Sequence, residues 1–365
     1  MPDWSTSLRP ELAELSSYVP AEPPGVRIRL DANESPPPSE AVRGAVARAI
    51  AATPLERYPD ARARELKARI AERTGARPEE LLIGTGSDDV IAVLLTAMAR
   101  PRERAPVATV LVPTPTFVMY RVTAKTNGLK PIEVPLDAGW DLDVGQMTRA
   151  IEMMRPGIVF IASPNNPTGN CMSDERVRAI LDVAAGYDIL VVVDEAYGDY
   201  AGKSLRTWRE QYPNLGILRT LSKVGLAALR VGWLEADASL VHEVDKARQP
   251  YNVSATSQAA AAAVLGEAWG EVTSHVAAVV RERDRVSSAL RELAGVDVVP
   301  SDANFLWVGT ERPASEVYER LVQRGVLVRS FHASGGRLGN RLRVTIGSPS
   351  ENDGFLEAFA GAVAR

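Results

Sequence analysis

The sequence of 365 residues predicts an α/β protein with a mainly parallel seven-stranded large domain and a small α+β domain. Apolar runs rich in Val and Ile alternate with helical segments through the middle of the chain, as in a sheet that is buried on both faces. The pattern changes after Asn252 to a long Ala-rich helical stretch and then to short strands. A chain of this length is too long for one small core, which favours two domains.

Composition excludes several classes of partner. Apolar residues make up 45% and charged residues 24% of the chain, and the formal net charge is −4, so no basic excess points to nucleic acid. The single cysteine, Cys171, excludes an intramolecular disulfide. The first ten residues lack an apolar signal core, and no apolar run is long enough to cross a membrane. We expect a cytoplasmic protein with no membrane partner.

The first 38 residues form a Pro-rich arm that we expect to be either disordered or pinned across another surface. A pinned arm could bring Tyr18 and Asn33 to a cleft. Ser39 then has the side chain of a helix N-cap, and the helix that it starts is predicted to end near Ala52.

Residues 39–253 are predicted to form the large domain, although the helix of residues 39–52 could belong with the small one. After a helix at residues 61–74, residues 81–99 indicate a strand, a Gly turn and an apolar helix. Further strands are expected at residues 107–113, 130–136, 157–164, 189–197, 215–222 and 230–236. Helices such as that of residues 173–186 supply the βαβ alternation.

Residues 254–365 are predicted to contain one linking helix, residues 255–293, and the small domain. That domain should hold short strands, a helix at residues 313–324 and a terminal helix that begins at Ser350. In an open α/β sheet, ligands bind beyond the carboxyl ends of the strands, so polar residues at those ends are the candidates for a site.

The GTGSDD motif, residues 84–89, matches the dinucleotide fingerprint only in part, because Asp89 stands where the third glycine belongs. A Gly turn before a helix still exposes amide N–H groups that bind a phosphate. The alternative is a structural turn in which Ser87 or Asp88 caps the helix. The three histidines have no metal-ligand spacing, so no metal site is predicted.

Together, the polar residues at the predicted strand ends favour pyridoxal 5′-phosphate as the cofactor. The amine of Lys223 can condense with an aldehyde, and the carboxylate of Asp194, at the end of an apolar strand, needs a cationic partner such as a pyridinium nitrogen. Asn166 and Tyr197 can donate to a phenolate oxygen, and Phe117 can stack on a flat ring. Ser87, Ser222 and Arg230 can hold a phosphate, and Arg343 can bind a carboxylate through its planar guanidinium.

The motifs SPNNPTGN, DEAY, TLSK with LRVGW, and LRVTIG resemble those of fold-type I pyridoxal-phosphate aminotransferases of the aspartate-aminotransferase type. In addition, DANESP, RYPDA, GTGSDD, PTFVMY, ANFLW and GVLVRSF are similar to the histidinol-phosphate aminotransferase family. The resemblance extends from about Tyr18 to the C-terminus. Aromatic aminotransferases and threonine-phosphate decarboxylases share most of these motifs.

The resemblance implies a role for each candidate residue. Lys223 would bind the cofactor covalently and move the proton during catalysis. Asp194 would pair with the ring nitrogen. The remaining cofactor contacts would be Asn166 and Tyr197 at the ring hydroxyl, Phe117 on the ring face, and Ser87, Asp88, Ser222 and Arg230 at the phosphate. Substrate would be bound by Arg343 at the α-carboxylate and by Tyr18 and Arg329 at its distal end, with Asn33 as a further substrate-binding residue.

The resemblance also implies a homodimer, in which Tyr58 reaches the phosphate in the neighbouring site. One departure is the segment from Lys223 to Arg230, which is one residue shorter than the family's usual SKAFGLAGLR form. This difference bears on the exact phosphate contacts of Ser222 and Arg230, and it leaves the assignment of Lys223 unchanged.

The implied reaction converts L-histidinol phosphate and 2-oxoglutarate to imidazole acetol phosphate and L-glutamate, in histidine biosynthesis. An aromatic amino-acid aminotransferase or a threonine-phosphate decarboxylase is the alternative within the same chemistry. A regulatory binding protein would need a DNA-binding extension, which we do not expect before Tyr18, and a nucleotide-dependent dehydrogenase would need the glycine that Asp89 replaces.

Overall fold

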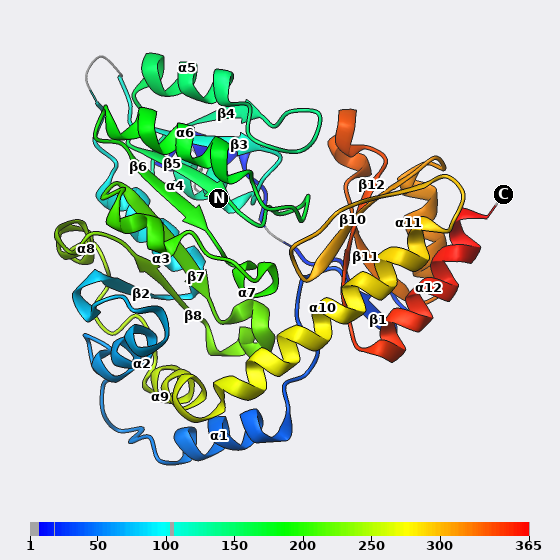
Figure 1. The fold of residues 1–365 in the computed structure, drawn as a ribbon, viewed down its shortest axis with the longest axis horizontal. Helices are drawn as coiled ribbons and strands as arrows, with labels where there is room; N and C mark the ends of the chain where they lie inside the picture. The colour runs from blue at the N-terminus through cyan, green and yellow to red at the C-terminus, as the bar shows by residue number, and fades with distance from the viewer. Residues whose placement is uncertain (1–6, 18, 103–105, 365) are drawn as a thin grey trace.

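The computed structural model describes residues 7–17, 19–102 and 106–364, and it contains two sheets (Figure 1). The larger sheet has seven strands in the order β2-β8-β7-β6-β5-β3-β4. β8 runs antiparallel to both of its neighbours, and the other strand pairs are parallel. The predicted mainly parallel, seven-stranded α/β sheet is therefore confirmed. Its strands are Leu81–Thr85 (β2), Thr109–Thr114 (β3), Lys130–Pro135 (β4), Ile158–Ala162 (β5), Leu190–Asp194 (β6), Leu215–Thr220 (β7) and Val231–Glu235 (β8).

Helices cover both faces of this sheet because its strands are apolar on both sides. One face packs against residues of α3 (Gly86–Ala97), α4 (Met119–Thr126) and α8 (Ala238–Asp245). The other face packs against α5 (Val144–Met154) and α6 (Asp174–Ala185). This arrangement leaves the carboxyl ends of the parallel strands as the accessible edge, which points towards the smaller sheet in Figure 1.

The smaller sheet has five strands in the order β1-β11-β12-β10-β9. Its strands are Ile28–Leu30 (β1), Val296–Val299 (β9), Phe305–Thr310 (β10), Val326–Ser330 (β11) and Arg341–Thr345 (β12), and its helices are α11 (Ala314–Gln323) and α12 (Pro349–Val363). β1 belongs to the predicted N-terminal arm and pairs parallel with β11. This part of the arm is therefore pinned to the small sheet, which is one of the two alternatives expected from the sequence.

The linking helix differs from the prediction. α9 (Ala255–Ala263) and α10 (Trp269–Arg291) are separated by a π-helical turn, Val264–Ala268, so the stretch is not one uninterrupted α-helix. α10 leaves the large sheet and runs under the small one (Figure 1). α1 (Glu40–Ala51) begins after Ser39, whose side chain accepts a hydrogen bond from Val42, and it packs on α9. The predicted Ser39 cap is confirmed.

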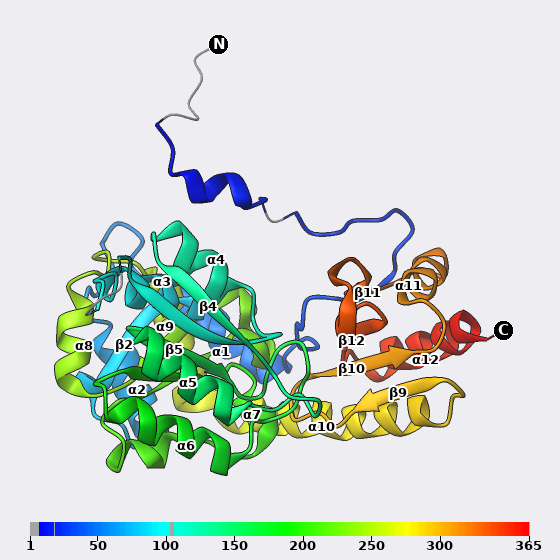
Figure 2. The same ribbon diagram turned by 90° about the horizontal axis from the view of Figure 1, so that it is seen from above.

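The arm before β1 passes back over the large sheet towards α4 (Figure 2). There Arg9 donates to the carbonyl of Thr126, and Glu14 pairs with Lys125. The remaining α-helices are α2 (Arg64–Thr74) and the short α7 (Gly198–Ala201). The remaining elements are short 3-10 or π-helical turns: Pro10–Glu14, Pro78–Glu80, Arg206–Glu210, Ser222–Leu226, Ala227–Leu229, His332–Ser334 and Gly336–Leu338.

Candidate active site

Three adjacent strands of the large sheet bring the central candidates together. Asn166 follows β5, Asp194 ends β6 and Lys223 follows β7, and these strands are hydrogen-bonded neighbours. Each apolar strand ends at the same edge, where its last residue or the turn after it is no longer covered by helices. The edge therefore carries an amide, a carboxylate and an amine.

Asp194 is a buried carboxylate with neutral hydrogen-bond partners. It is 4% exposed, its Oδ2 accepts from the Tyr120 hydroxyl at 2.6 Å, and its Oδ1 accepts from the amide of Ala196 at 2.9 Å. Burial raises its pKa from 3.8 to about 6, although these two hydrogen bonds oppose the rise. A cation placed against this carboxylate would favour its charged form.

Tyr120 was not among the predicted site residues. It lies in α4, is fully buried, stacks on Phe160 at 4.7 Å between ring centroids, and meets Phe117 edge to face at 5.6 Å. The half-buried Phe117 thus belongs to the same wall as the partner of Asp194. Phe117 lies two residues before α4 and three residues from Tyr120, and this spacing does not by itself indicate that Tyr120 bonds Asp194.

Lys223 lies in a five-residue π-helical turn, Ser222–Leu226, which Gly225 distorts at φ 88°. Its Nζ is 5.7 Å from the ring centroid of Tyr197, a buried side chain whose hydroxyl accepts from Nδ2 of Asn33 at 2.9 Å. The hydrogen of the Tyr197 hydroxyl therefore stays available to a ligand. Asn33 thus lies beside these candidate site residues, as expected for a residue of a pinned arm.

Next to the lysine, Arg230 faces the N-terminus of α3. Its Nη1 is 3.3 Å from Oγ of Ser222, and its Nη2 is 3.5 Å from Asp88. A Cβ atom on Gly86 would lie 2.6 Å from Nη2 of Arg230, so this glycine leaves room for the guanidinium. A Cβ on Gly232 would lie 2.5 Å from the amide nitrogen of Ser87, so Gly232 lets the two backbones approach. Free amides, a hydroxyl and a guanidinium form an anion cradle.

The helix at this cradle begins at Gly86, and its N-cap is Thr85. Neither Ser87 nor Asp88 is the cap, so the alternative interpretation of GTGSDD as a Ser87 or Asp88 cap is wrong. The shorter segment after Lys223 still brings Arg230 to Ser222, with Arg230 itself at φ 51°.

Arg343 reaches the site from the small sheet. Its Nη1 donates to Oδ1 of Asn166 at 2.6 Å, and its Nη2 donates to the carbonyl of Asp31 at 2.6 Å. Because the amide oxygen of Asn166 accepts from Arg343, its amide nitrogen is the group left to donate to a ligand. Arg329 lies directly across from Arg343 in the β11–β12 pair, and it is exposed.

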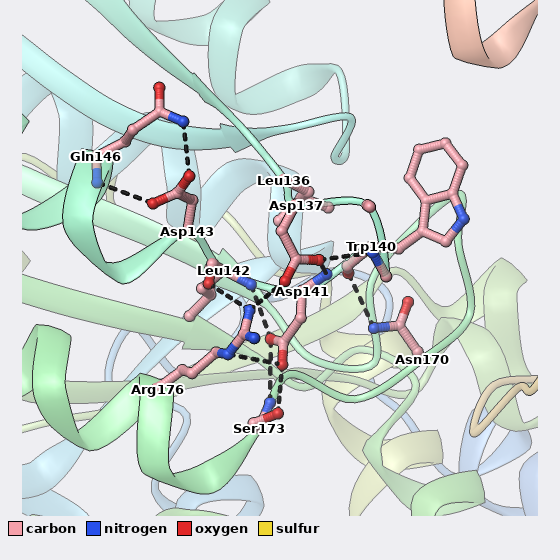
Figure 3. Close-up of polar contacts among 12 residues, drawn as sticks. Leu136, Asp137, Trp140, Asp141, Leu142, Asp143, Gln146, Asn170, Ser173 and Arg176 are labelled. Atoms are coloured by element: carbon pink, nitrogen blue, oxygen red, sulfur yellow. Dashed lines mark hydrogen bonds and ion pairs between the residues drawn. The ribbon is translucent and has the colours of Figure 1, made fainter.

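The segment from Asn170 to the first turn of α6, which follows Asn166 in the chain, is held by the loop after β4 (Figure 3). Asn170 donates to the carbonyl of Trp140 at 3.0 Å, and Ser173 donates through its backbone to Asp141 at 3.2 Å. Arg176 pairs with Asp137 at 2.5 Å and lies 3.5 Å from Asp141. No pattern in the sequence indicated this support, because its residues come from separate segments.

Two candidates are not brought to this edge by the described chain. Tyr58 is 82% exposed and stacks on Tyr251 at 4.8 Å between ring centroids. Tyr18 lies outside the described residues. In residues 7–17, 19–102 and 106–364, no cluster of three His, Cys, Asp or Glu side chains is placed to hold a metal ion, and no helix is long and apolar enough to cross a membrane.

Known proteins identify the family. Residues 27–359 match the model of class I and II aminotransferases. Histidinol-phosphate aminotransferase 2 of Nitrosococcus oceani is 39% identical over 356 residues, covering 96% of each chain, and the histidinol-phosphate aminotransferase of Aquifex aeolicus is 37% identical over 353 residues, covering 96% of this chain and 97% of its own. The chain belongs to the histidinol-phosphate aminotransferase family.

Solved structures agree with this fold. The histidinol-phosphate aminotransferase of Sinorhizobium meliloti, solved in complex with pyridoxal-5′-phosphate, superposes with a TM-score of 0.83 at 24% identity and covers 93% of this chain and 91% of its own. The L-threonine-O-3-phosphate decarboxylase of Porphyromonas gingivalis gives a TM-score of 0.75 at 19% identity, covering 92% and 99%. The fold is thus the predicted fold-type I, shared by enzymes of different reaction types.

Proposed function

We propose that this aminotransferase transfers the amino group between L-histidinol phosphate and 2-oxoglutarate, giving imidazole acetol phosphate and L-glutamate, with pyridoxal 5′-phosphate as its cofactor. The observation that carries the proposal is that one amine, Lys223, interacts electrostatically with the buried Asp194 carboxylate and directly follows Ser222 of the anion cradle. Relatives named for this activity over nearly the whole chain support it.

The residues fit this cofactor chemically. Its ring nitrogen would supply the cation that the buried Asp194 lacks among its hydrogen-bond partners, Tyr120 and Ala196. Asn166 and Tyr197 each keep a hydrogen to donate to the ring hydroxyl, and Phe117 offers a ring face. Ser87, Asp88, Ser222 and Arg230 would hold the phosphate at the start of α3, where its charge is favoured.

When bound, the cofactor supplies the electron sink that weakens the Cα–H bond of an amino acid. The chain's own part is to place a base at that bond. Lys223 Nζ would first hold the cofactor and, once the substrate amine replaces it, take the proton from Cα and return it to the cofactor side. Asp194 would keep the ring nitrogen charged during this transfer.

Substrate recognition would come from the small sheet. Arg343 would grip the α-carboxylate through its planar guanidinium, and its bond to Asn166 ties that grip to the cofactor. Arg329 lies opposite Arg343, on β11. Two cationic side chains at directly opposed positions repel each other unless a bound anion offsets their charge. This pairing suits a substrate with two anionic ends, with Tyr18 and Asn33 as further contacts.

We also propose a homodimer that works in the cytoplasm, in which Tyr58 enters the neighbouring site. The support is that Tyr58 is 82% exposed while its ring stacks on that of Tyr251. A large aromatic side chain so displayed is typical of an interface.

Absorbance titration of the purified holoenzyme tests the function. Micromolar L-histidinol phosphate should convert the cofactor band to its amine form, and L-phenylalanine should do so poorly. Preference for L-phenylalanine would instead favour an aromatic aminotransferase, and release of carbon dioxide from threonine phosphate would favour the decarboxylase. A protein with no cofactor band after pyridoxal 5′-phosphate is added would contradict the proposal altogether.

A further inference from the structure

Behind Lys223, side chains from three separate parts of the chain form a continuous row of hydrogen bonds. Tyr200 in α7 donates to the backbone carbonyl of Lys223 at 2.5 Å, and the Ser35 hydroxyl lies 3.1 Å from the Tyr200 hydroxyl. Nε2 of His275, in α10, lies 2.8 Å from Oγ of Ser35. We call these four residues the Tyr200 row. Tyr200 is 4% exposed, so the centre of the row is shielded from water.

Donor counting gives the row a single direction. Tyr200 has one hydroxyl hydrogen, and the Lys223 carbonyl can only accept, so Tyr200 uses that hydrogen there. The Ser35 hydroxyl must then donate to the Tyr200 oxygen, which leaves Ser35 as an acceptor towards His275. Nε2 of His275 therefore carries a hydrogen, and the row runs from His275 through Ser35 and Tyr200 to Lys223.

The turn that holds Lys223 needs such support because it is irregular. Val224 and Gly225 leave helical geometry, at φ −109° and φ 88°. A Cβ atom on Gly225 would lie 3.5 Å from the carbonyl oxygen of Pro36 and 3.8 Å from Nε2 of His275. The turn is thus packed directly against the segment of Ser35 and against α10.

The same arm segment is fixed to the small sheet. The backbone amide of Asn33 donates to Oγ1 of Thr345 at 2.9 Å, and Nδ2 of Asn304 donates to the carbonyl of Asn33 at 3.1 Å. Thr345 is in β12, the strand of Arg343. Ser35 therefore connects the lysine turn with the sheet that carries the proposed carboxylate grip.

We propose that Tyr200 is a positioning residue for the aminotransfer reaction: it fixes the backbone of Lys223, and Ser35 and His275 fix Tyr200. The inference rests on the proposed role of Lys223 as the reacting amine. Proton transfer at Cα demands close alignment, and a misplacement of about 1 Å reduces the rate of such a step on the order of 100-fold. The hydroxyl of Tyr200 acts through the backbone and touches neither substrate nor cofactor.

The test compares the Tyr200→Phe holoenzyme with wild type. We expect kcat with L-glutamate to fall about 10-fold while KM stays within about twofold, because alignment is lost and binding is kept. The pH midpoint of the cofactor absorbance band should also move, since it reports the surroundings of Lys223 Nζ. Tyr212→Phe is the matched control, because it removes a hydroxyl that bonds Asp182 at the surface, and it should match wild type in all three quantities.

Single variants of Ser35 and His275 supply an independent test should Tyr200→Phe fail to fold. Ser35→Ala should lower kcat in the same direction, and the double variant Ser35→Ala/Tyr200→Phe should be no slower than Tyr200→Phe alone, since Ser35 acts through Tyr200. His275→Gln, whose amide still donates, should retain more activity than His275→Leu.

Two results would overturn the inference. One is a Tyr200→Phe enzyme with unchanged kcat and an unchanged pH midpoint, even if it melts earlier. The other is a Ser35→Ala effect that adds in full to that of Tyr200→Phe. A wild-type protein without a cofactor band would reject the proposed function instead, so the two failures are distinguishable.

Discussion

Asp194 combines a buried position with neutral hydrogen-bond partners, and this has a consequence for stability. Its pKa of about 6 in the fold exceeds the value of 3.8 for an ordinary carboxyl, so the folded chain binds more protons than the unfolded chain between these pH values. The stability that this proton provides is complete below about pH 4 and is lost as pH rises through about 6. At about 1.4 kcal/mol per pKa unit, the loss is about 3 kcal/mol.

We therefore expect the cofactor-free wild type to lose about 3 kcal/mol of unfolding free energy relative to Asp194→Asn between pH 4 and pH 7. Urea unfolding of both proteins across this range measures the difference. With cofactor bound, the trend should shrink, because a cation beside Asp194 lowers its pKa. A difference that stays constant with pH in the cofactor-free proteins would refute this account.

At the scale of residues, the candidate site residues that could be predicted from the sequence are those that end or follow apolar strands. Lys223, Asp194 and Asn166 could be predicted together, because ligands of an open α/β sheet bind beyond the carboxyl ends of the strands, where all three were expected. Tyr120, Ser35 and His275 could not be predicted, because the residue that a helix or loop side chain contacts depends on how distant segments of the chain pack. For the same reason, no spacing rule indicated that Asn166 bonds Arg343.

At the scale of elements, a buried ion pair joins the ends of β6 and β7. Arg219, whose side chain is 9% exposed, bonds Glu195 at 3.0 Å and Asp199 at 2.8 Å. Glu195 also accepts from the backbone of Leu205 at 2.7 Å. These bonds hold together the strands that carry Asp194 and lead to Lys223.

Removing the cation from this pair leaves Glu195 charged and buried. We expect Arg219→Met to lower the free energy of unfolding by about 3–5 kcal/mol. Arg64→Met is the control: Arg64 is 80% exposed and pairs with Asp60 at 2.9 Å, so its loss should change the free energy of unfolding far less than Arg219→Met does. Chemical denaturation measures both, and equal losses would contradict the argument.

Most elements could be predicted because their periodicity is strong, but the break between α9 and α10 could not. Gly266 and Gly270 lower the helix propensity at this point of an otherwise Ala-rich stretch, but a glycine alone does not distinguish a π-helical turn from a continuous α-helix. The strand β1 was also missed, since three residues flanked by proline-rich segments have too little pattern.

At the scale of the whole molecule, the proposed dimer would place Tyr58 of one chain beside Lys223 of the other. A mixture of Tyr58→Ala and Lys223→Ala chains should then recover about a quarter of wild-type activity once subunits exchange. Half of the random dimers would be mixed, and each would own one intact site out of two. Activity after mixing and refolding measures this. If Tyr58 served its own chain, every site would stay defective.

The anion cradle depends on contacts between distant parts of the chain. Gly86 follows β2, whose neighbour in the sheet is β8, and Asn252 bonds Asp89 across 163 residues at 2.7 Å. Contacts between such distant segments form late, because closing long loops costs entropy before any pairing compensates for it. A nascent chain would hence be unable to hold the cofactor until β8 had docked on β2, and cofactor capture would report that this part of the large sheet has formed.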